Sequence, residues 1–160
     1  MRQVQGNFNF IQAYTLPKIL SEKPGFILVE LGKTFENYLE QRLHSIQLGR
    51  REFTVLLAIS EIGPISQQRL SDLLQIDRTT MVFLLDELQK MKLVQRNANP
   101  EDRRAHALIV TSAAKTLLKR AMLIVEEAQI EFTSGLTREE NRQLDKLILK
   151  LFMKTQQDFL

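Results

Sequence analysis

The chain has 160 residues, of which 44% are hydrophobic, so it can bury the core of one domain. The net charge of +3 permits an anionic partner without requiring one, and the absence of cysteine excludes disulfides, thiolate metal sites and a cysteine redox switch. Neither terminus resembles a signal peptide, and no apolar run is long enough to cross a bilayer, so we expect a cytoplasmic protein.

Residues 1–24 are predicted to be an N-terminal arm. The arm is too apolar for an ordinary disordered tail. It either packs on its own domain or embraces a second subunit, and both readings stay open. Its apolar residues are Phe8, Phe10, Ile11, Tyr14, Leu16, Ile19 and Leu20.

Two helices are predicted next. The first, from Pro24-Gly25 to about His44, has apolar residues every three or four positions, and residues 25–48 are assigned to a dimerisation helix. The second, from Arg50 to about Ser60, is apolar almost all round and is expected to be buried. Gly63 follows it and is expected to supply the positive φ that often ends a helix.

Residues 49–111 are predicted to form a DNA-binding lobe. Ser66 is a candidate N-cap for a short helix with Leu70, Leu73 and Leu74 on one face. Asp77 is a stronger N-cap, because its carboxylate can accept from the free amides of the next turn. Two short helices joined by a tight turn form a helix-turn-helix. The second has apolar residues at helical spacing, namely Met81, Leu84, Leu85 and Leu88.

Two strands, 92–96 and 106–110, are predicted around a charged turn, 97–104, which makes the motif a winged helix-turn-helix. Residues 112–160 should form two long helices. Thr111 is expected to cap the first, which runs to about Ser134, and Thr137 with Glu140 matches a capping box at the start of the second. The fold class is therefore mainly α. The apolar stripes of the long terminal helices favour a homodimer.

Several residues are placed to read DNA in this arrangement. Arg78 can present its guanidinium fork to guanine, and Thr79 and Thr80 can donate hydroxyls to phosphates. A methyl of one of these threonines or of Met81 can contact a thymine methyl. The helix that begins at Ser66 and Gln67 has free amides that can hold a phosphate.

The segments 77–81, 93–96 and 100–105, together with Thr111, resemble the MarR family of bacterial transcriptional regulators. The resemblance covers residues 26–152 and implies a homodimer with interleaved terminal helices. It also implies that Asp102 holds Arg104 for insertion into the minor groove, with Arg103 on a phosphate. The chain departs from the family pattern at Gln75 and Lys92, where glycine is common, and at Phe83, where some relatives carry arginine. We expect Lys92 to adopt a left-handed conformation.

The resemblance further implies an aromatic or phenolic effector between the dimer helices and the lobe, near Tyr38, His44, Arg51 and Phe53. The sequence thus predicts a ligand-responsive homodimeric repressor that binds a palindromic operator in double-stranded DNA. The alternative is a winged-helix protein-interaction module without specific DNA binding. No catalytic motif, metal site or cofactor is predicted, because His44 and His106 are isolated and no nucleophile or phosphate-loop signature occurs.

Overall fold

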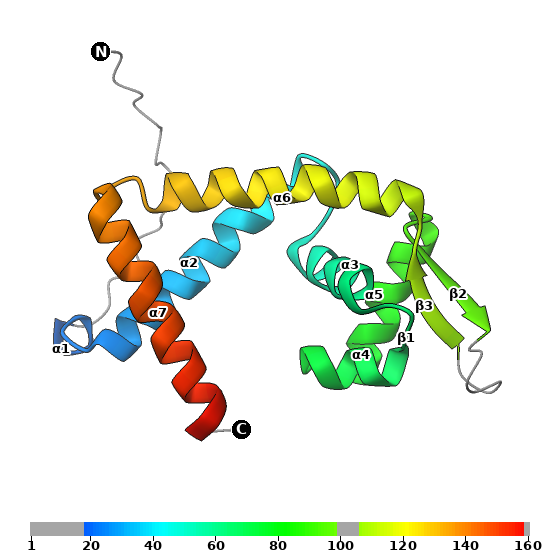
Figure 1. Cartoon of the computed structure of the whole chain (residues 1–160), viewed down its shortest axis with the longest axis horizontal. Coiled ribbons are helices and arrows are strands. Elements are labelled where there is room, and N and C mark those ends of the chain that lie inside the picture. Colours follow the sequence, from blue (N-terminus) through cyan, green and yellow to red (C-terminus); the bar gives the residue numbers. More distant parts are fainter. Residues whose placement is uncertain (1–17, 99–105, 159–160) are drawn as a thin grey trace, which may run out of the picture. The chain divides into compact units, whose positions relative to one another are not determined.

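A computed structural model describes residues 18–98 and 106–158 (Figure 1). The chain divides into two compact units, residues 1–50 and 51–160. None of the described helices combines the length and the hydropathy that a membrane span requires.

The first unit contains α1 (Lys18–Ser21) and α2 (Pro24–His44). The bounds predicted for α2 are confirmed, and proline occupies its first turn, where a missing N–H costs nothing. The apolar stripe of α2 has two parts. Leu39 and Leu43 near its end are buried, whereas Phe26 and Leu28 near its start are exposed.

Helix α3 (Arg50–Ile62) is buried on one face, at Phe53, Val55, Leu56 and Ile59. The expectation of burial all round is only partly confirmed, because Leu57 and Ala58 are half-buried. The prediction for Gly63 is wrong, because none of the glycines in the described part has a positive φ. A Cβ on Gly63 would instead lie 2.5 Å from the Ile59 carbonyl oxygen, which accepts a hydrogen bond from the Gly63 N–H. Glycine is therefore required here by close backbone approach.

Helices α4 (Gln67–Leu74) and α5 (Arg78–Lys90) form the predicted helix-turn-helix (Figure 1). Both predicted caps are confirmed. Ser66 Oγ accepts from the Arg69 amide at 3.3 Å, and Asp77 Oδ1 accepts from the Thr80 amide at 2.9 Å. The chain turns at Gln75, which is left-handed with φ 51°.

The predicted inner face of α4 is partly wrong. Leu70 is buried, but Leu73 is 51% exposed, and Ser71 is buried instead. At 100° per residue, Leu70, Ser71 and Leu74 share one arc, and Leu73 lies outside it. A helix of only eight residues leaves this face ambiguous in the sequence.

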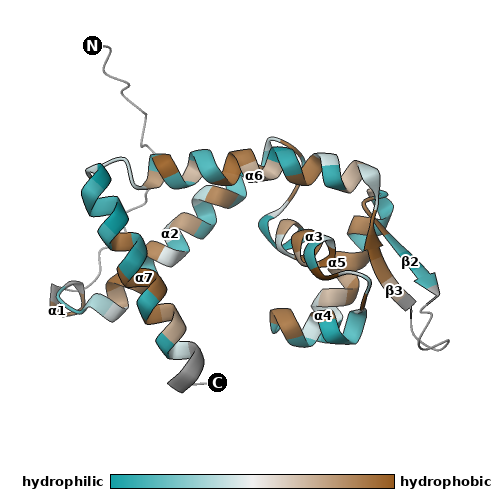
Figure 2. Ribbon diagram, in the orientation of Figure 1, coloured by the Kyte–Doolittle hydropathy of each residue, from teal (hydrophilic) through white to brown (hydrophobic). Residues whose placement is uncertain are grey.

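The hairpin consists of β2 (Val94–Ala98) and β3 (His106–Val110), with Val94 opposite Val110. A strand that the sequence analysis missed, β1 (Ile65–Ser66), pairs antiparallel with β3, giving the sheet order β1-β3-β2. Figure 2 shows β3 as hydrophobic and β2 as mainly hydrophilic. The predicted start of the first strand at Lys92 is wrong, because β2 begins at Val94. Lys92 precedes the strand with φ 59°, so its predicted left-handed conformation is confirmed.

Helices α6 (Ser112–Phe132) and α7 (Arg138–Asp158) follow the wing. Thr111 Oγ1 accepts from the Ala114 amide at 3.2 Å and donates to the Lys92 carbonyl at 2.9 Å, so the predicted cap also ties α6 to the start of the hairpin. The capping box of α7 is confirmed. Glu140 Oε2 accepts from the Thr137 amide at 2.7 Å, and Thr137 Oγ1 accepts from the Glu140 amide at 3.3 Å.

Candidate nucleic-acid interface

The second helix of the motif, α5, has two distinct faces. Its inward face is apolar and at most 3% exposed, and it packs within the lobe, where α5 lies beside α4 and β2. The inward residues are Met81, Leu84, Leu85 and Leu88. The outward face is exposed along the whole helix and consists of Arg78, Thr79, Val82, Phe83, Asp86 and Lys90. This outward face is the candidate DNA-reading surface.

The first turn of α5 presents Arg78 and Thr79 to solvent, and Thr80 is half-buried. Met81 is fully buried, with 0% exposure. Its predicted contact with a thymine methyl is therefore wrong, because its side chain faces the core at the spacing of Leu84 and Leu88. The helical period of the apolar residues decides the orientation of Met81.

At the start of α4, Ser66 and Gln67 are both half-buried. The Ser66 hydroxyl caps the helix, and its contact with a phosphate stays a prediction, as does that of Gln67. Gln68 Nε2 donates to Asp72 Oδ1 at 2.8 Å and so engages the one carboxylate of this helix.

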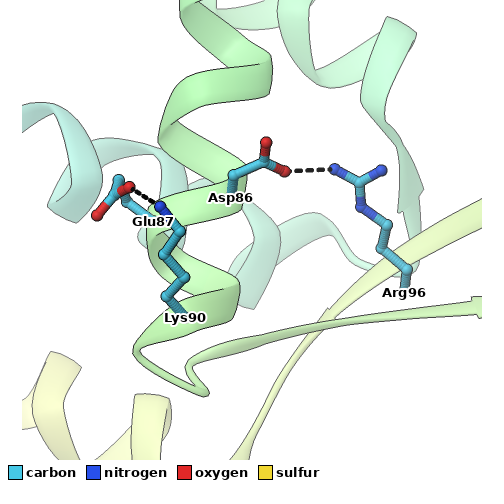
Figure 3. A network of polar contacts seen from close by, with 4 residues as sticks. All are labelled: Asp86, Glu87, Lys90 and Arg96. Carbon is cyan, nitrogen blue, oxygen red and sulfur yellow. Dashed lines mark hydrogen bonds and ion pairs between the residues drawn. The ribbon is translucent and has the colours of Figure 1, made fainter.

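Every carboxylate between residues 65 and 98 has a local partner. This stretch contains five Lys and Arg residues and four Asp and Glu residues. Asp72 accepts from Gln68, and Asp77 caps α5. The other two form ion pairs that Figure 3 shows together. Asp86 Oδ1 lies 3.3 Å from Arg96 Nη2, and Glu87 Oε1 lies 2.6 Å from Lys90 Nζ.

Three cations of the same stretch, Arg69, Arg78 and Lys92, have no ion-pair partner among the residues that the structure describes. The lobe is only weakly basic by count. The two ion pairs cancel two positive and two negative charges, so Arg69, Arg78 and Lys92 remain against the carboxylates of Asp72 and Asp77, which have neutral hydrogen-bond donors. Arg78 is the one of the three on the outward face of α5.

Two groups near this face have shifted pKa values. The pKa of Asp77 is lowered, first by the hydrogen bond with the Thr80 side chain and then by the Thr80 amide. The pKa of Lys90 is raised by its hydrogen bond and attraction to Glu87. Both shifts keep these groups charged around neutral pH.

The Asp86–Arg96 pair is a contact that the sequence analysis missed. It joins the outward face of α5 to β2 (Figure 3). The two residues are ten positions apart on different elements. No helical or strand period could have indicated the contact.

The predicted wing-tip residues Asp102, Arg103 and Arg104 lie outside the described residues. The strands that flank them are paired up to Ala98 opposite His106. The proposed effector residues fall in both units. In the first, Tyr38 is half-buried with the Arg42 guanidinium 5.9 Å from its ring centroid, and His44 Nε2 lies 3.2 Å from Glu40 Oε1. In the second, Arg51 is exposed and Phe53 is 7% exposed.

Comparison with known proteins agrees with this geometry. Residues 48–106 match the model of the MarR family. Wild-type MarR from E. coli in its apo form is 23% identical, with a TM-score of 0.75 over 80% of this chain and 96% of that one. A probable transcriptional regulator from Pseudomonas aeruginosa is 24% identical, with a TM-score of 0.71 over 82% and 98%. A mutant E. coli MarR complexed with operator DNA is 22% identical, with a TM-score of 0.70 over 85% and 99%.

The structural similarities, all at identities below 25%, establish the fold. The family match adds a sequence similarity over residues 48–106. The matched family is one of transcription regulators and not of enzymes. Residues 48–106 are therefore similar to the MarR family, and the chain has the fold of the MarR-family structures that it matches.

Proposed function

We propose that the chain is a sequence-specific regulator that binds double-stranded DNA. The observation that carries this proposal is the first turn of α5, where Arg78 stands exposed and free of ion pairs among the described residues while the carboxylates around it are engaged. The second helix of a helix-turn-helix enters the major groove with its N-terminal residues foremost. Arg78 would then reach guanine O6 and N7, with Thr79 and Thr80 on phosphates.

The lobe would grip the duplex at two further places. The first turn of α4, at Ser66 and Gln67, has amides with no helical acceptor, which suits a phosphate. The wing would insert Arg104 into the minor groove, with Asp102 holding its rotamer and Arg103 on a phosphate. These contacts fix the register of the lobe, whereas Arg78 supplies base recognition.

We further propose that two copies bind a palindromic operator. Exposed apolar side chains on α2 and α7, including Phe26, Leu28, Leu151 and Phe152, support an interface between copies, since such surfaces in water favour a partner. A two-fold dimer places two recognition helices about 34 Å apart, one turn of DNA. A protein of the same fold, a mutant E. coli MarR, has been solved in complex with operator DNA, which supports DNA as the partner.

Regulation by a ligand completes the proposal. A small aromatic or phenolic anion near Tyr38, His44, Arg51 and Phe53 would favour a dimer with another helix spacing and so weaken operator binding by its differential affinity. The protein would act as a repressor that the ligand releases. Calorimetry with salicylate tests this step. We expect heat of binding that His44→Ala reduces, and the absence of heat with the wild type would overturn it.

The decisive experiment is selection of binding sites from random duplexes, followed by a salt titration of affinity for the selected site. We expect a palindrome, and an affinity that falls steeply with salt because phosphate contacts release counterions. Arg78→Ala should weaken binding about tenfold or more and relax the preference at one guanine. The matched control is Arg120→Ala, which removes an exposed arginine from α6 and should bind like the wild type.

Arg104→Ala should abolish specific binding and leave the dimer intact, as measured by sedimentation. Wild-type protein that ignores duplex DNA even at low salt would overturn the proposal in favour of a protein-interaction module. So would an Arg78→Ala variant with unchanged affinity and unchanged base preference.

A further inference from the structure

Two large apolar side chains lie on the outward face of α5, where the chain departs from a polar DNA-binding surface. Phe83 is 62% exposed and Val82 is 42% exposed. Single exposed apolar residues are normal on protein surfaces, so exposure alone decides nothing. The position is what matters, because Val82 follows Arg78 by four residues and Phe83 follows Thr79 by four.

Side chains four residues apart on a helix are neighbours on its surface. Val82 therefore lies next to Arg78, and Phe83 lies next to Thr79, on the face that the proposed function directs at base edges. Phe83 is about 7.5 Å further along the helix axis than Arg78, at 1.5 Å per residue. The two side chains can thus reach bases that are close together in one half-site.

The chemistry of this face limits what Phe83 can read. Between Thr79 and Lys90 the exposed side chains of this face are Val82, Phe83 and Asp86, and the Asp86 carboxylate is paired with Arg96. The amide on this stretch of the face, Gln89, is half-buried near the end of the helix, six residues beyond Phe83. An aromatic ring gains nothing from a phosphate. In the major groove, the apolar group on a base edge is the 5-methyl of thymine, which side chains such as Phe contact.

We propose that Phe83, flanked by Val82, contacts the 5-methyl group of a thymine in each half-site and is a specificity-determining residue. This inference rests on the proposed DNA-binding function. Contact with the methyl group removes apolar surface of both partners from water, which favours thymine over cytosine. The ring has only two side-chain torsions to order, so the contact costs little entropy.

Replacing each thymine of the selected operator by deoxyuridine removes only the methyl group. We expect the wild type to lose about three- to tenfold in affinity at one thymine of each half-site. Phe83→Ala should bind the thymine operator more weakly by a similar factor and should no longer distinguish thymine from deoxyuridine there. Phe83→Leu, which retains an apolar side chain, should keep part of the discrimination.

Ile62→Ala is the matched control, because Ile62 is an exposed apolar residue at the end of α3, outside the helix-turn-helix. This variant should discriminate like the wild type. If Phe83→Ala binds specifically but discriminates at every thymine as the wild type does, the inference fails and the proposed function stands. If the wild type binds no duplex at all, both fail. Circular dichroism of each variant verifies that it is folded.

Discussion

Helices α5 and α7 both carry apolar residues at helical spacing, but these residues are buried in α5 and exposed in α7. In α5 the apolar residues Met81, Leu84, Leu85 and Leu88 are at most 3% exposed. In α7 the residues of the corresponding stripe are 47% to 60% exposed, and they are Leu147, Ile148, Leu151 and Phe152. Figure 2 shows hydrophobic and hydrophilic turns of α7 side by side.

This difference in exposure shows that helical spacing of apolar residues identifies an apolar face but does not identify what covers that face. The face of α5 is covered by its own lobe, where α4 and β2 lie beside it. The face of α7 is exposed among the residues that the structure describes, and we propose that a second copy covers it. Substitutions in α5 should therefore change folding, whereas substitutions in α7 should change association.

The largest expected effect is that of Leu85→Ala in α5. Leu85 is 0% exposed, so truncation removes buried methyl groups and leaves a cavity. We expect the free energy of unfolding to fall by about 2–5 kcal/mol, measured by urea denaturation. Leu149→Ala, at a 60% exposed leucine of α7, is the control and should change it by less than about 1 kcal/mol. Equal losses in the two variants would remove the distinction between the helices.

Ile148→Glu tests the open face of α7. Ile148 is 47% exposed in the single chain, so a glutamate there is tolerated in a monomer but would be buried unpaired at an interface. We expect the dimer dissociation constant, measured by sedimentation equilibrium, to rise about 30-fold or more.

The matched control is Lys150→Glu, which adds the same side chain to the same helix about 200° away from Ile148. This variant should remain dimeric. A dimer that tolerates Ile148→Glu as well as Lys150→Glu would exclude the α7 stripe from the interface and leave its exposure unexplained.

The sequence was sufficient where the chemistry is local. The caps at Ser66, Asp77, Thr111 and Thr137 were all predicted and are all observed, because each depends on a side chain and an amide three residues later. The left-handed Lys92 was also predicted, from the resemblance to a family in which glycine is common at this position.

Features that depend on distant parts of the chain were missed or misjudged. Strand β1 has only two residues and exists through its pairing with β3, which no local pattern reveals. The Asp86–Arg96 pair joins two elements. Met81 was predicted to contact a thymine methyl, but the helical spacing that identified the core also places Met81 in it. The roles of the wing tip and of the effector residues remain predictions.

Removing a helix cap should have a global effect on stability in α4 but only a local effect in α7. Ser66→Ala removes the cap of α4 in the helix-turn-helix and should lower the global free energy of unfolding by about 1 kcal/mol. Thr137→Ala removes a cap of similar geometry from α7. Because the apolar face of α7 is exposed among the described residues, we expect the loss of the Thr137 cap to cause only local fraying of α7 in the dissociated protein. Amide exchange should be faster at residues 138–141, with the global transition unchanged. A global loss in both variants would contradict this.

The smallest effect expected is a dependence of stability on pH at the starts of α5 and α7. The pKa of Asp77 is lowered by hydrogen bonds with Thr80, and that of Glu140 by hydrogen bonds from the Thr137 amide and hydroxyl. A lowered folded-state pKa contributes stability that is present above the ordinary carboxyl pKa of about 4 and is lost as pH falls through the folded value. Asp77→Asn keeps a capping oxygen but does not titrate. The melting temperature of the wild type should therefore exceed that of Asp77→Asn near pH 6, and the difference should shrink below pH 4. In Glu140→Gln the corresponding loss should be confined to amide exchange of α7. A difference between wild type and Asp77→Asn that grows as the solution is acidified would show that the cap carboxylate is not the group responsible.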